Sequence, residues 1–203
     1  APKVLKLITP EACAEKDISG WLPLHHALRE APEGVVLAII GAGPQEEDFA
    51  ALHGQPLTAG GSNRVYCVPK FVSQAEVAAA YCAADAYFSG SEFETLGFGA
   101  IEAMSCGAPA LCPAAQGFRD TVQHGVTGYL YTPRSVEHAD ECLAKLRDGR
   151  EIDAAAMLAA GESMTIAGCA ARAREVYADA AEANRTRPCA ARPDPSAGIP
   201  TQG

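Results

Sequence analysis

The stretch VVLAII at residues 35–40, followed at once by GAGP at residues 41–44, decides the fold class. Six consecutive apolar residues are typical of a strand that is buried on both faces, as the strands of parallel sheets are. The glycines and the proline then predict a sharp turn, after which a helix is expected over residues 45–53. A buried strand that leads through a tight turn into a helix is the opening of a βαβ unit.

The same alternation of short β-rich runs and helical stretches continues from this strand toward the C-terminus. Ser73 and Glu76 have the spacing of a capping box at the start of a helix. Further strands are predicted at residues 65–68, 86–89, 109–112 and 129–131, and helices at residues 74–83, 98–106, 136–147 and 167–184. The fold class expected from this order is α/β, a single Rossmann-like domain with a mostly parallel sheet and helices on both faces.

The chain of 203 residues is long enough for one substantial core. We expect one domain over residues 1–184 and a disordered tail over residues 185–203, a segment rich in Pro, Arg, Gly and Ser. The first residues, Ala1 and Pro2, and the apolar stretch at residues 4–8 show neither an initiator methionine nor the pattern of a signal peptide. The chain is therefore expected to be part of a longer protein.

The composition argues against several classes of function. The formal net charge of -9 argues against a general affinity for nucleic acid or anionic lipid, because both need a surplus of Lys and Arg. No apolar run approaches the roughly 20 residues of a membrane-spanning helix, so any membrane contact is expected to be peripheral. The eight cysteines include no C-x-x-C pair. We interpret them as reduced thiols rather than disulfides or metal ligands.

The segment after the strand predicted at residues 86–89 is the most informative about function. Residues 89–104 read SGSEFETLGFGAIEAM and join a strand to a helix through three glycines and three glutamates. Gly97 and Gly99 let backbone N–H groups approach a ligand, and the positive end of the helix dipole points to the same place. Carboxylates beside such an anion site are expected to face the hydroxyl donors of a ribose or a hexose. A sugar nucleotide supplies phosphate, ribose and hexose together.

This stretch resembles the sugar-nucleotide loop of retaining glycosyltransferases with the GT-B architecture, in which S-E-x-E-T-x-G-x-x-x-x-E-A-M-x-x-G-x-P recurs. The resemblance covers about residues 14–147 in the family's order. It includes the E-K pair at residues 15–16, IGAGP at residues 40–44 and GVTGYL at residues 125–130. It implies the C-terminal, donor-binding half of a GT-B fold, which takes a hexose-type sugar from a UDP-sugar and transfers it with retention. The N-terminal acceptor domain is then missing from this chain.

Within that family the sequence is most similar to the sulfolipid synthases of plants and cyanobacteria, which transfer sulfoquinovose from its UDP donor to diacylglycerol. The segments ETLGF at residues 94–98 and DECLAKL at residues 140–146 carry this likeness. It implies a lipid acceptor at a membrane surface and a membrane-associated enzyme in a plastid. Without it, a cytoplasmic location is expected.

The resemblance assigns roles to individual residues. Lys16 matches the family lysine that neutralises the donor diphosphate and stabilises the leaving group, which makes it one of two expected catalytic residues. The other is Glu94, which matches the first glutamate of the family pair, placed by the transferred sugar. Glu102 matches the second glutamate, which binds the ribose diol. Taken without this context, Lys16 would be interpreted as a solvated surface lysine and either glutamate as a solvent-facing residue.

Backbone groups complete the expected donor site. Gly97 and Phe98 match positions whose amides contact the sugar and the phosphate, although Phe98 also fits a core position. Val72 falls where the family's main chain meets the base. No metal and no cofactor are implied, because Lys16 and the amides at the helix start would neutralise the diphosphate. In this family retention is explained by attack on the same face, with the leaving phosphate helping to deprotonate the acceptor.

Three departures from the family pattern affect these expectations. Glu11 stands where the family has an arginine five residues before the lysine, and this exchange is expected to weaken donor binding by about 2 kcal/mol or more. The usual G-G after the next strand reads Gln116-Gly117, and the usual F-x-G reads VPK at residues 68–70.

Two other functions fit part of the sequence. A non-catalytic sugar-nucleotide-binding module or fragment is favoured by Glu11 and by the missing acceptor domain. A flavodoxin-like or dinucleotide-binding domain would use the turn at residues 41–44. That turn lacks G-x-G-x-x-G, and Pro44 removes an N–H that a phosphate would need.

Overall fold

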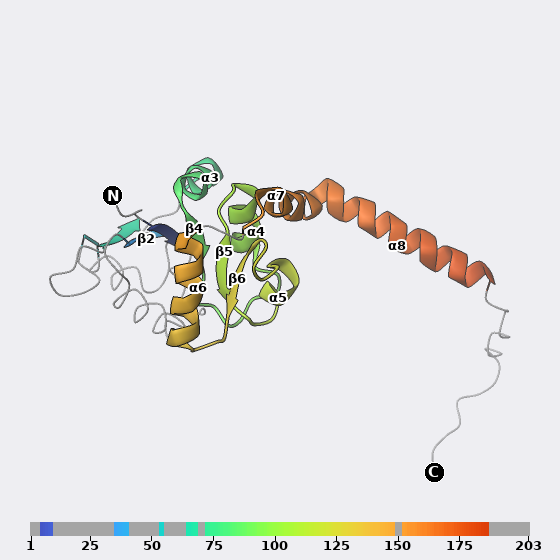
Figure 1. The fold of residues 1–203 in the computed structure, drawn as a ribbon. Helices are drawn as coiled ribbons and strands as arrows, with labels where there is room; N and C mark the ends of the chain where they lie inside the picture. Colours follow the sequence, from blue (N-terminus) through green and yellow to red (C-terminus); the bar gives the residue numbers. More distant parts are fainter. Residues whose placement is uncertain are drawn as a thin grey trace, which may run out of the picture. The chain divides into compact units, whose positions relative to one another are not determined.

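The computed structural model describes residues 5–9, 35–40, 53–54, 64–68, 72–148 and 152–186 of the chain. The chain divides into two compact units, Ala1–Met164 and Thr165–Gly203. The described part of the first unit contains a parallel sheet and helices packed on it, and that of the second unit is the single helix α8, Ile166–Thr186 (Figure 1). The sequence predicted one domain ending at residue 184, whereas the boundary between the two units follows Met164.

The sheet of the first unit has six strands in the order β3-β2-β1-β4-β5-β6, and all neighbouring strands pair in parallel. This is the strand order of the dinucleotide-binding, doubly wound fold. The predicted fold class, a parallel Rossmann-like α/β domain, is therefore confirmed. The strands are β1 (Leu5–Thr9), β2 (Val35–Ile40), β3 (Arg64–Val68), β4 (Ala86–Phe88), β5 (Ala110–Pro113) and β6 (Gly128–Tyr131).

The described helices of the first unit cover both faces of the sheet. Successive residues of a strand point to opposite faces, so neighbouring residues of one strand contact different helices. Phe88 belongs to the cluster that contains α6, whereas its neighbour Tyr87 belongs to the cluster that contains α3, α4 and α7. The helices are α3 (Gln74–Ala83), α4 (Phe98–Ser105), α5 (Phe118–Thr121), α6 (Val136–Asp148) and α7 (Ala154–Ser163).

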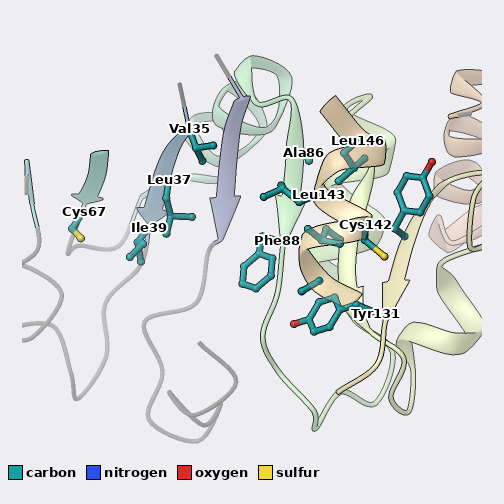
Figure 2. Packing of buried hydrophobic residues seen from close by; sticks show 13 residues of the cluster. Val35, Leu37, Ile39, Cys67, Ala86, Phe88, Tyr131, Cys142, Leu143 and Leu146 are labelled. Atoms are coloured by element: carbon teal, nitrogen blue, oxygen red, sulfur yellow. The ribbon is translucent and has the colours of Figure 1, made fainter. Parts of the chain in front are cut away.

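The core on the α6 side joins strands from the whole width of the sheet (Figure 2). Leu37 on β2, Phe88 on β4 and Leu143 on α6 are at most 2% exposed. The rings of Phe88 and Tyr131 stack with centroids 6.3 Å apart and planes 6° from parallel. Each large apolar side chain buried in this way contributes roughly 1.5–3 kcal/mol to folding.

The local signals of several helices are present as the sequence predicted. At the start of α3 the Ser73 hydroxyl accepts from the Glu76 N–H at 3.3 Å, and the Ser73 N–H donates to the Glu76 carboxylate at 2.7 Å. The end of α4 is followed by Gly107, whose φ of +86° suits the left-handed position after a helix. The strands and helices predicted between residues 72 and 148 are present, with bounds that differ by at most one residue.

Two helices, α5 and α7, were not predicted. α5 has four residues, too few for a periodic pattern to be recognised. α7 begins after Asp153, whose carboxylate caps it by accepting from the N–H groups of Ala155 and Ala156. An aspartate directly before an alanine-rich run is a helix-start signal that the sequence contains. Within α7, Gly161 packs directly against the Ser105 side chain at the end of α4.

The start of the disordered tail was predicted too early in the sequence, at residue 185. Arg185 and Thr186 are the last residues of α8, where the Arg185 guanidinium pairs with Glu182 one turn earlier. A cation in the last turn is also favoured by the helix dipole. Residues 187–203, the turn at residues 41–44 and nearly all of the helix predicted at residues 45–53 lie outside the described residues. Within the part of the chain that is described, no single helix is long and apolar enough to span a membrane.

Candidate functional site

The segment that joins β4 to α4, residues 89–97, lies where the strand order of the sheet reverses. β1 pairs with β4, Ile8 opposite Tyr87, and the order runs through β2 and β3 on one side and through β5 and β6 on the other. Ligands of doubly wound sheets bind beyond the carboxyl ends of the strands at such a reversal. The topology therefore puts the glycine- and glutamate-rich segment at the position where this fold binds ligands.

The first residues of this loop are fixed by the neighbouring strands. The Ser89 N–H donates to the carbonyl of Leu111 at 3.1 Å, and the Ser89 carbonyl accepts from the Tyr131 hydroxyl at 2.9 Å. Burial raises the pKa of Tyr131 well above its ordinary value, so its hydroxyl remains a proton donor. Buried Ser91 accepts from the Phe93 N–H at 3.3 Å. The loop is thus shaped by contacts from β5 and β6.

Gly97 provides the turn that starts α4. Its φ of +74° and ψ of +54° are left-handed, a conformation that glycine adopts at little cost. A Cβ at this position would lie 2.6 Å from the Phe118 ring. The first N–H groups of a helix have no partner within the helix, and those of Phe98 and Gly99 donate to no backbone carbonyl among the described residues. They form the kind of helix start that binds anions.

The backbone at Glu94 is held in place by the loop that follows β5. Its carbonyl accepts from the Gly117 N–H at 2.9 Å, and a Cβ on Gly117 would collide with the backbone at Thr95. The loop after β5 therefore packs directly against the loop after β4. The Glu94 side chain is partly exposed.

Gln116 stands where the family has the first glycine of its G-G pair, and its backbone has a conformation that a glycine adopts readily. Gln116 has a φ of +39°, inside the left-handed region where a glycine costs least. The side chain of Gln116 is exposed. The substitution therefore changes the surface beside the loop, while Gly117 keeps its contact with Glu94.

Glu102 lies on α4 and faces the last turn of α3. Although the residue as a whole is exposed, its carboxyl is partly desolvated, and this burial raises its pKa above the ordinary value. The nearby hydroxyl of Tyr81 opposes that rise. An ionised carboxylate has about four acceptor positions, so the contact with Tyr81 leaves room for the two hydroxyls of a diol.

The sequence alone did not reveal one ion pair at this loop. The Arg134 Nε donates to Oε1 of Glu92 at 2.9 Å, and the Glu92 side chain is only 20% exposed. Arg134 has a φ of +63°, which is uncommon for a residue with a side chain. The first glutamate of the SEFE segment was a visible signal, but its partner lies 42 residues away. The pair attaches the loop after β6 to the loop that carries Glu94.

The other expected site residues have different outcomes. Phe98 is 65% exposed, so the alternative that it fills the core is wrong. Ile101 and Met104 on the same helix are buried, as expected for packing residues. Val72 is half-buried immediately before α3. Lys16 and Glu11 lie outside the described residues, so their assigned roles remain predictions.

Two further features of the first unit bear on ligands. A hollow of about 580 Å³ lies between α4, α5 and α7, with Met104, Arg119 and Ser163 among its lining residues. Of the predicted site residues that the structure describes, none lines it. Within the described ranges no group of three or more His, Cys, Asp or Glu side chains could hold a metal ion. Because Lys16 and its neighbours are not among those residues, a metal-free donor site remains a prediction.

Comparison with known proteins gives the same family over most of the chain. The model of the family described as "Glycosyl transferases group 1" matches residues 11–162. The sulfoquinovosyl transferase SQD2 of Arabidopsis thaliana is 35% identical over 128 residues, which are 61% of this chain and 22% of that protein. The D-inositol 3-phosphate glycosyltransferase of Thermobispora bispora is 36% identical over 124 residues, 58% of this chain and 28% of that protein. The chain thus spans about a quarter of the length of these relatives.

Solved structures show the same fold. The crystal structure of HepE from Anabaena, in complex with UDP and glucose, matches with a TM-score of 0.64 and 23% sequence identity. The match covers 87% of this chain and 48% of HepE. This chain is therefore similar in fold to about half of that protein.

Proposed function

The chain belongs to the glycosyl transferases group 1 family, and from this membership we propose that it is the donor-binding half of a retaining GT-B enzyme that uses a UDP-sugar. The observation that carries the proposal is the start of α4, where the N–H groups of Phe98 and Gly99 after left-handed Gly97 donate to no backbone carbonyl among the described residues, in the segment that also carries Glu94 and Glu102. The open N–H groups suit a diphosphate, and the two carboxylates suit the sugar hydroxyls on either side of it. UDP is the first nucleotide to test, because HepE, which has the same fold, was crystallised with UDP and glucose.

In the proposed mechanism each residue has a separate task. Lys16 and the N–H groups of Gly97 and Phe98 stabilise the negative charge that develops on the diphosphate as the glycosidic bond breaks. Glu94 lies by the transferred sugar, Glu102 binds the ribose diol, and the main chain at Val72 contacts the base. The acceptor attacks from the face that the diphosphate leaves, and the leaving phosphate takes its proton. The charge is neutralised without a metal, so EDTA leaves UDP binding unchanged.

We further propose that the transferred sugar is sulfoquinovose and that the acceptor is diacylglycerol at a plastid membrane. This proposal is supported by the 35% identity to SQD2 over 128 residues. Other relatives of the family have names that indicate different chemistry, among them a GDP-mannose-dependent mannosyltransferase of Mycobacterium tuberculosis with 30% identity over 146 residues. A panel of UDP, UDP-glucose, UDP-sulfoquinovose and GDP-mannose separates these donors. Tightest binding of GDP-mannose would overturn the UDP assignment.

The main test is the affinity of the chain for UDP in the wild type and in Glu102→Ala. Loss of the carboxylate removes the acceptor of two ribose hydroxyls, and we expect the Kd measured by calorimetry to rise at least about tenfold. Glu141→Ala is the matched control, because Glu141 is an exposed glutamate on α6, on the opposite face of the sheet. Equal affinities of the wild type and Glu102→Ala would remove Glu102 from the site.

A second function, a sugar-nucleotide-binding module without transferase activity, is favoured by Glu11. A carboxylate in place of a phosphate-binding arginine repels the donor diphosphate. The two functions differ in turnover when the chain is joined to an acceptor-binding half from a relative. Sugar transfer supports the enzyme. Binding of UDP without transfer, restored to transfer by Glu11→Arg, supports the non-catalytic module.

A further inference from the structure

The turn between β6 and α6 carries an arginine at a position that suits a glycine. The Ser135 N–H donates to the Thr132 carbonyl at 3.0 Å, which closes a turn over residues 132–135. Pro133 is the second residue of this turn, and Arg134 is the third, with a φ of +63°. Turns with proline second and a positive φ third favour glycine at the third position, because a side chain there strains the backbone. The turn by itself therefore gives no reason for an arginine.

The start of α6 fixes the backbone of this turn. The Thr132 N–H donates to Nδ1 of His138 at 3.0 Å. The Ser135 hydroxyl accepts from the His138 N–H at 3.2 Å, and the Ser135 carbonyl accepts from the Ala139 N–H at 3.1 Å. Strand β6 and helix α6 thus hold the residues on both sides of Arg134. A side chain that extends from a fixed backbone can fix the position of the group that it binds.

The group that Arg134 binds is the carboxylate of Glu92, in the loop between β4 and α4. The Arg134 Nε donates to Oε1 of Glu92 at 2.9 Å, and the Glu92 side chain is only 20% exposed. The Arg134 side chain is 67% exposed, and ion pairs with so much contact with water add little to the stability of a fold. The main effect of this pair is therefore expected on the conformation of the loop.

The loop is short, and the pair holds its middle. Before Glu92, the Ser89 N–H donates to the Leu111 carbonyl, and after it the Glu94 carbonyl accepts from the Gly117 N–H. A partly buried carboxylate that loses its cation turns toward water, because an unpaired charge is costly to bury. Since Glu92 precedes Glu94 by two residues, such a movement changes the backbone angles that direct the Glu94 side chain.

We propose that Arg134 is a positioning residue, which holds Glu92 so that Glu94 is directed at the sugar of the donor. This inference rests on the proposed function, in which Glu94 lies by the transferred sugar and Glu102 binds the ribose. The ion pair then supports binding of the sugar. UDP without a sugar uses Glu102 and the start of α4, and its binding depends little on the pair.

Arg134→Gly separates this role from a purely structural one. Glycine relieves the strain of the positive φ while the ion pair is lost, so we expect the Tm to change by no more than about 3 °C. Calorimetry gives the Kd of UDP and that of the tighter-binding of UDP-glucose and UDP-sulfoquinovose. We expect the Kd of the UDP-sugar to rise about tenfold and that of UDP less than about threefold. Arg174→Ala, the control, removes an exposed arginine of the second unit and should change neither Kd.

Two substitutions of Glu92 test whether the two residues act as a pair. Glu92→Gln keeps an oxygen that can accept from Arg134, and we expect it to bind the UDP-sugar within about threefold of the wild type. Glu92→Ala removes the acceptor and should weaken binding as much as Arg134→Gly does. The double variant with both Glu92→Ala and Arg134→Gly should lose no more than either single variant, because the same interaction is removed in all three. Losses that add in the double variant would overturn the pair as their cause.

Amide hydrogen exchange, followed by NMR, tests the loop without a ligand. The Phe93 N–H donates to the Ser91 hydroxyl at 3.3 Å, and the Gly117 N–H donates to the Glu94 carbonyl at 2.9 Å. In Arg134→Gly we expect both N–H groups to exchange at least about tenfold faster than in the wild type. The N–H of Ser89, which β5 holds, should exchange at the same rate in both chains. Unchanged exchange at Phe93 and Gly117 would show that Arg134 does not hold the loop.

The two Kd values distinguish failure of this inference from failure of the proposed function. If Arg134→Gly lowers the Tm and weakens UDP and the UDP-sugar equally, Arg134 only supports the fold and the inference is wrong, while the proposed function stands. If the wild type binds neither UDP nor a UDP-sugar, the proposed function fails and the sugar-directing role fails with it. The exchange rates then still decide whether Arg134 fixes the loop.

Discussion

At the scale of single residues, Glu102 illustrates how a carboxylate proposed to bind a ligand can reduce stability. Its carboxyl lies where burial disfavours the charged form, and Tyr81 compensates for only part of that effect. Residues with such perturbed pKa values are often found at binding sites, where a group that lowers the stability of the fold can increase the affinity for a ligand. Because the expected effects of Glu102 on binding and on stability have opposite signs, the two can be tested separately.

The raised pKa of Glu102 predicts how pH affects its contribution to folding. Because the pKa in the folded chain is above the ordinary value of 4.5, the contribution is fully present below that value and is lost as pH rises through the folded pKa. Glu102→Gln removes this loss and retains an oxygen that can accept from Tyr81. We therefore expect the Tm of Glu102→Gln relative to wild type to be higher at about pH 7 than at about pH 4.

Thermal unfolding followed by circular dichroism measures this difference, with Glu141→Gln as the control for removing one exposed negative charge. The Glu141→Gln variant should show no such change with pH. A relative Tm of Glu102→Gln that falls as pH rises would mean that the folded chain favours the ionised carboxylate, contrary to the burial described here.

At the scale of elements, the start of α4 depends on one glycine. In Gly97→Ala the methyl group would be forced into a left-handed backbone, which costs about 1–2 kcal/mol. It would also meet the buried Phe118 ring of α5 at 2.6 Å, and such overpacking costs a further 1–3 kcal/mol or so. We expect denaturant unfolding to show a loss of roughly 2–5 kcal/mol, together with loss of UDP binding.

Gly107→Ala is the matched control for this variant. Gly107 also has a positive φ, +86°, but a Cβ there would have no atom within 4 Å. The control should lose only the backbone part of the free energy and should keep UDP binding. Equal losses of free energy in both variants would show that the Phe118 ring moves aside at little cost. Packing between α4 and α5 would then not restrict the residue at position 97.

The elements also show which parts of the structure could be predicted from sequence. The capping box at Ser73 and the glycine after α4 are local signals, and both gave helix ends correctly. α7 was missed because its alanine-rich sequence has no clear polar face, although Asp153 marked its start. The pair of Glu92 and Arg134 could not be predicted, since no pattern within one segment links residues 42 positions apart. Long-range partners follow only from the strand order.

At the scale of the whole molecule, the described cores lie entirely in the first unit. Both hydrophobic clusters consist of residues up to Met157, whereas α8 belongs to the second unit. We therefore expect a chain that ends at Met164 to unfold cooperatively, with a Tm within about 3 °C of the full chain, which is about the shift that a loss of 1 kcal/mol would cause at this size. Scanning calorimetry of the two chains provides the measurement. A broad or absent transition in the shorter chain would show that residues 165–203 help to hold the first unit together.

The α/β fold class was predictable because most of the described strands are short and apolar and alternate with helical stretches. The family followed from one glycine- and glutamate-rich loop and its flanking motifs, and residues 11–162 match that family. Exposed Phe98 and the junction of Tyr81 with Glu102 depend on packing between α3, α4 and the sheet, which no single segment encodes. The role of Lys16 rests on the family likeness alone.

The long-range supports of the candidate loop have a consequence for protein synthesis. Ser89 and Glu92 receive their hydrogen bonds from Tyr131 and Arg134, which are translated 42 residues later. A nascent chain therefore contains the loop and its glycines well before it contains the groups that shape them. The proposed nucleotide site can therefore take its final shape only after residue 134 has left the ribosome, and we expect ligand to give no help in the earlier steps of folding.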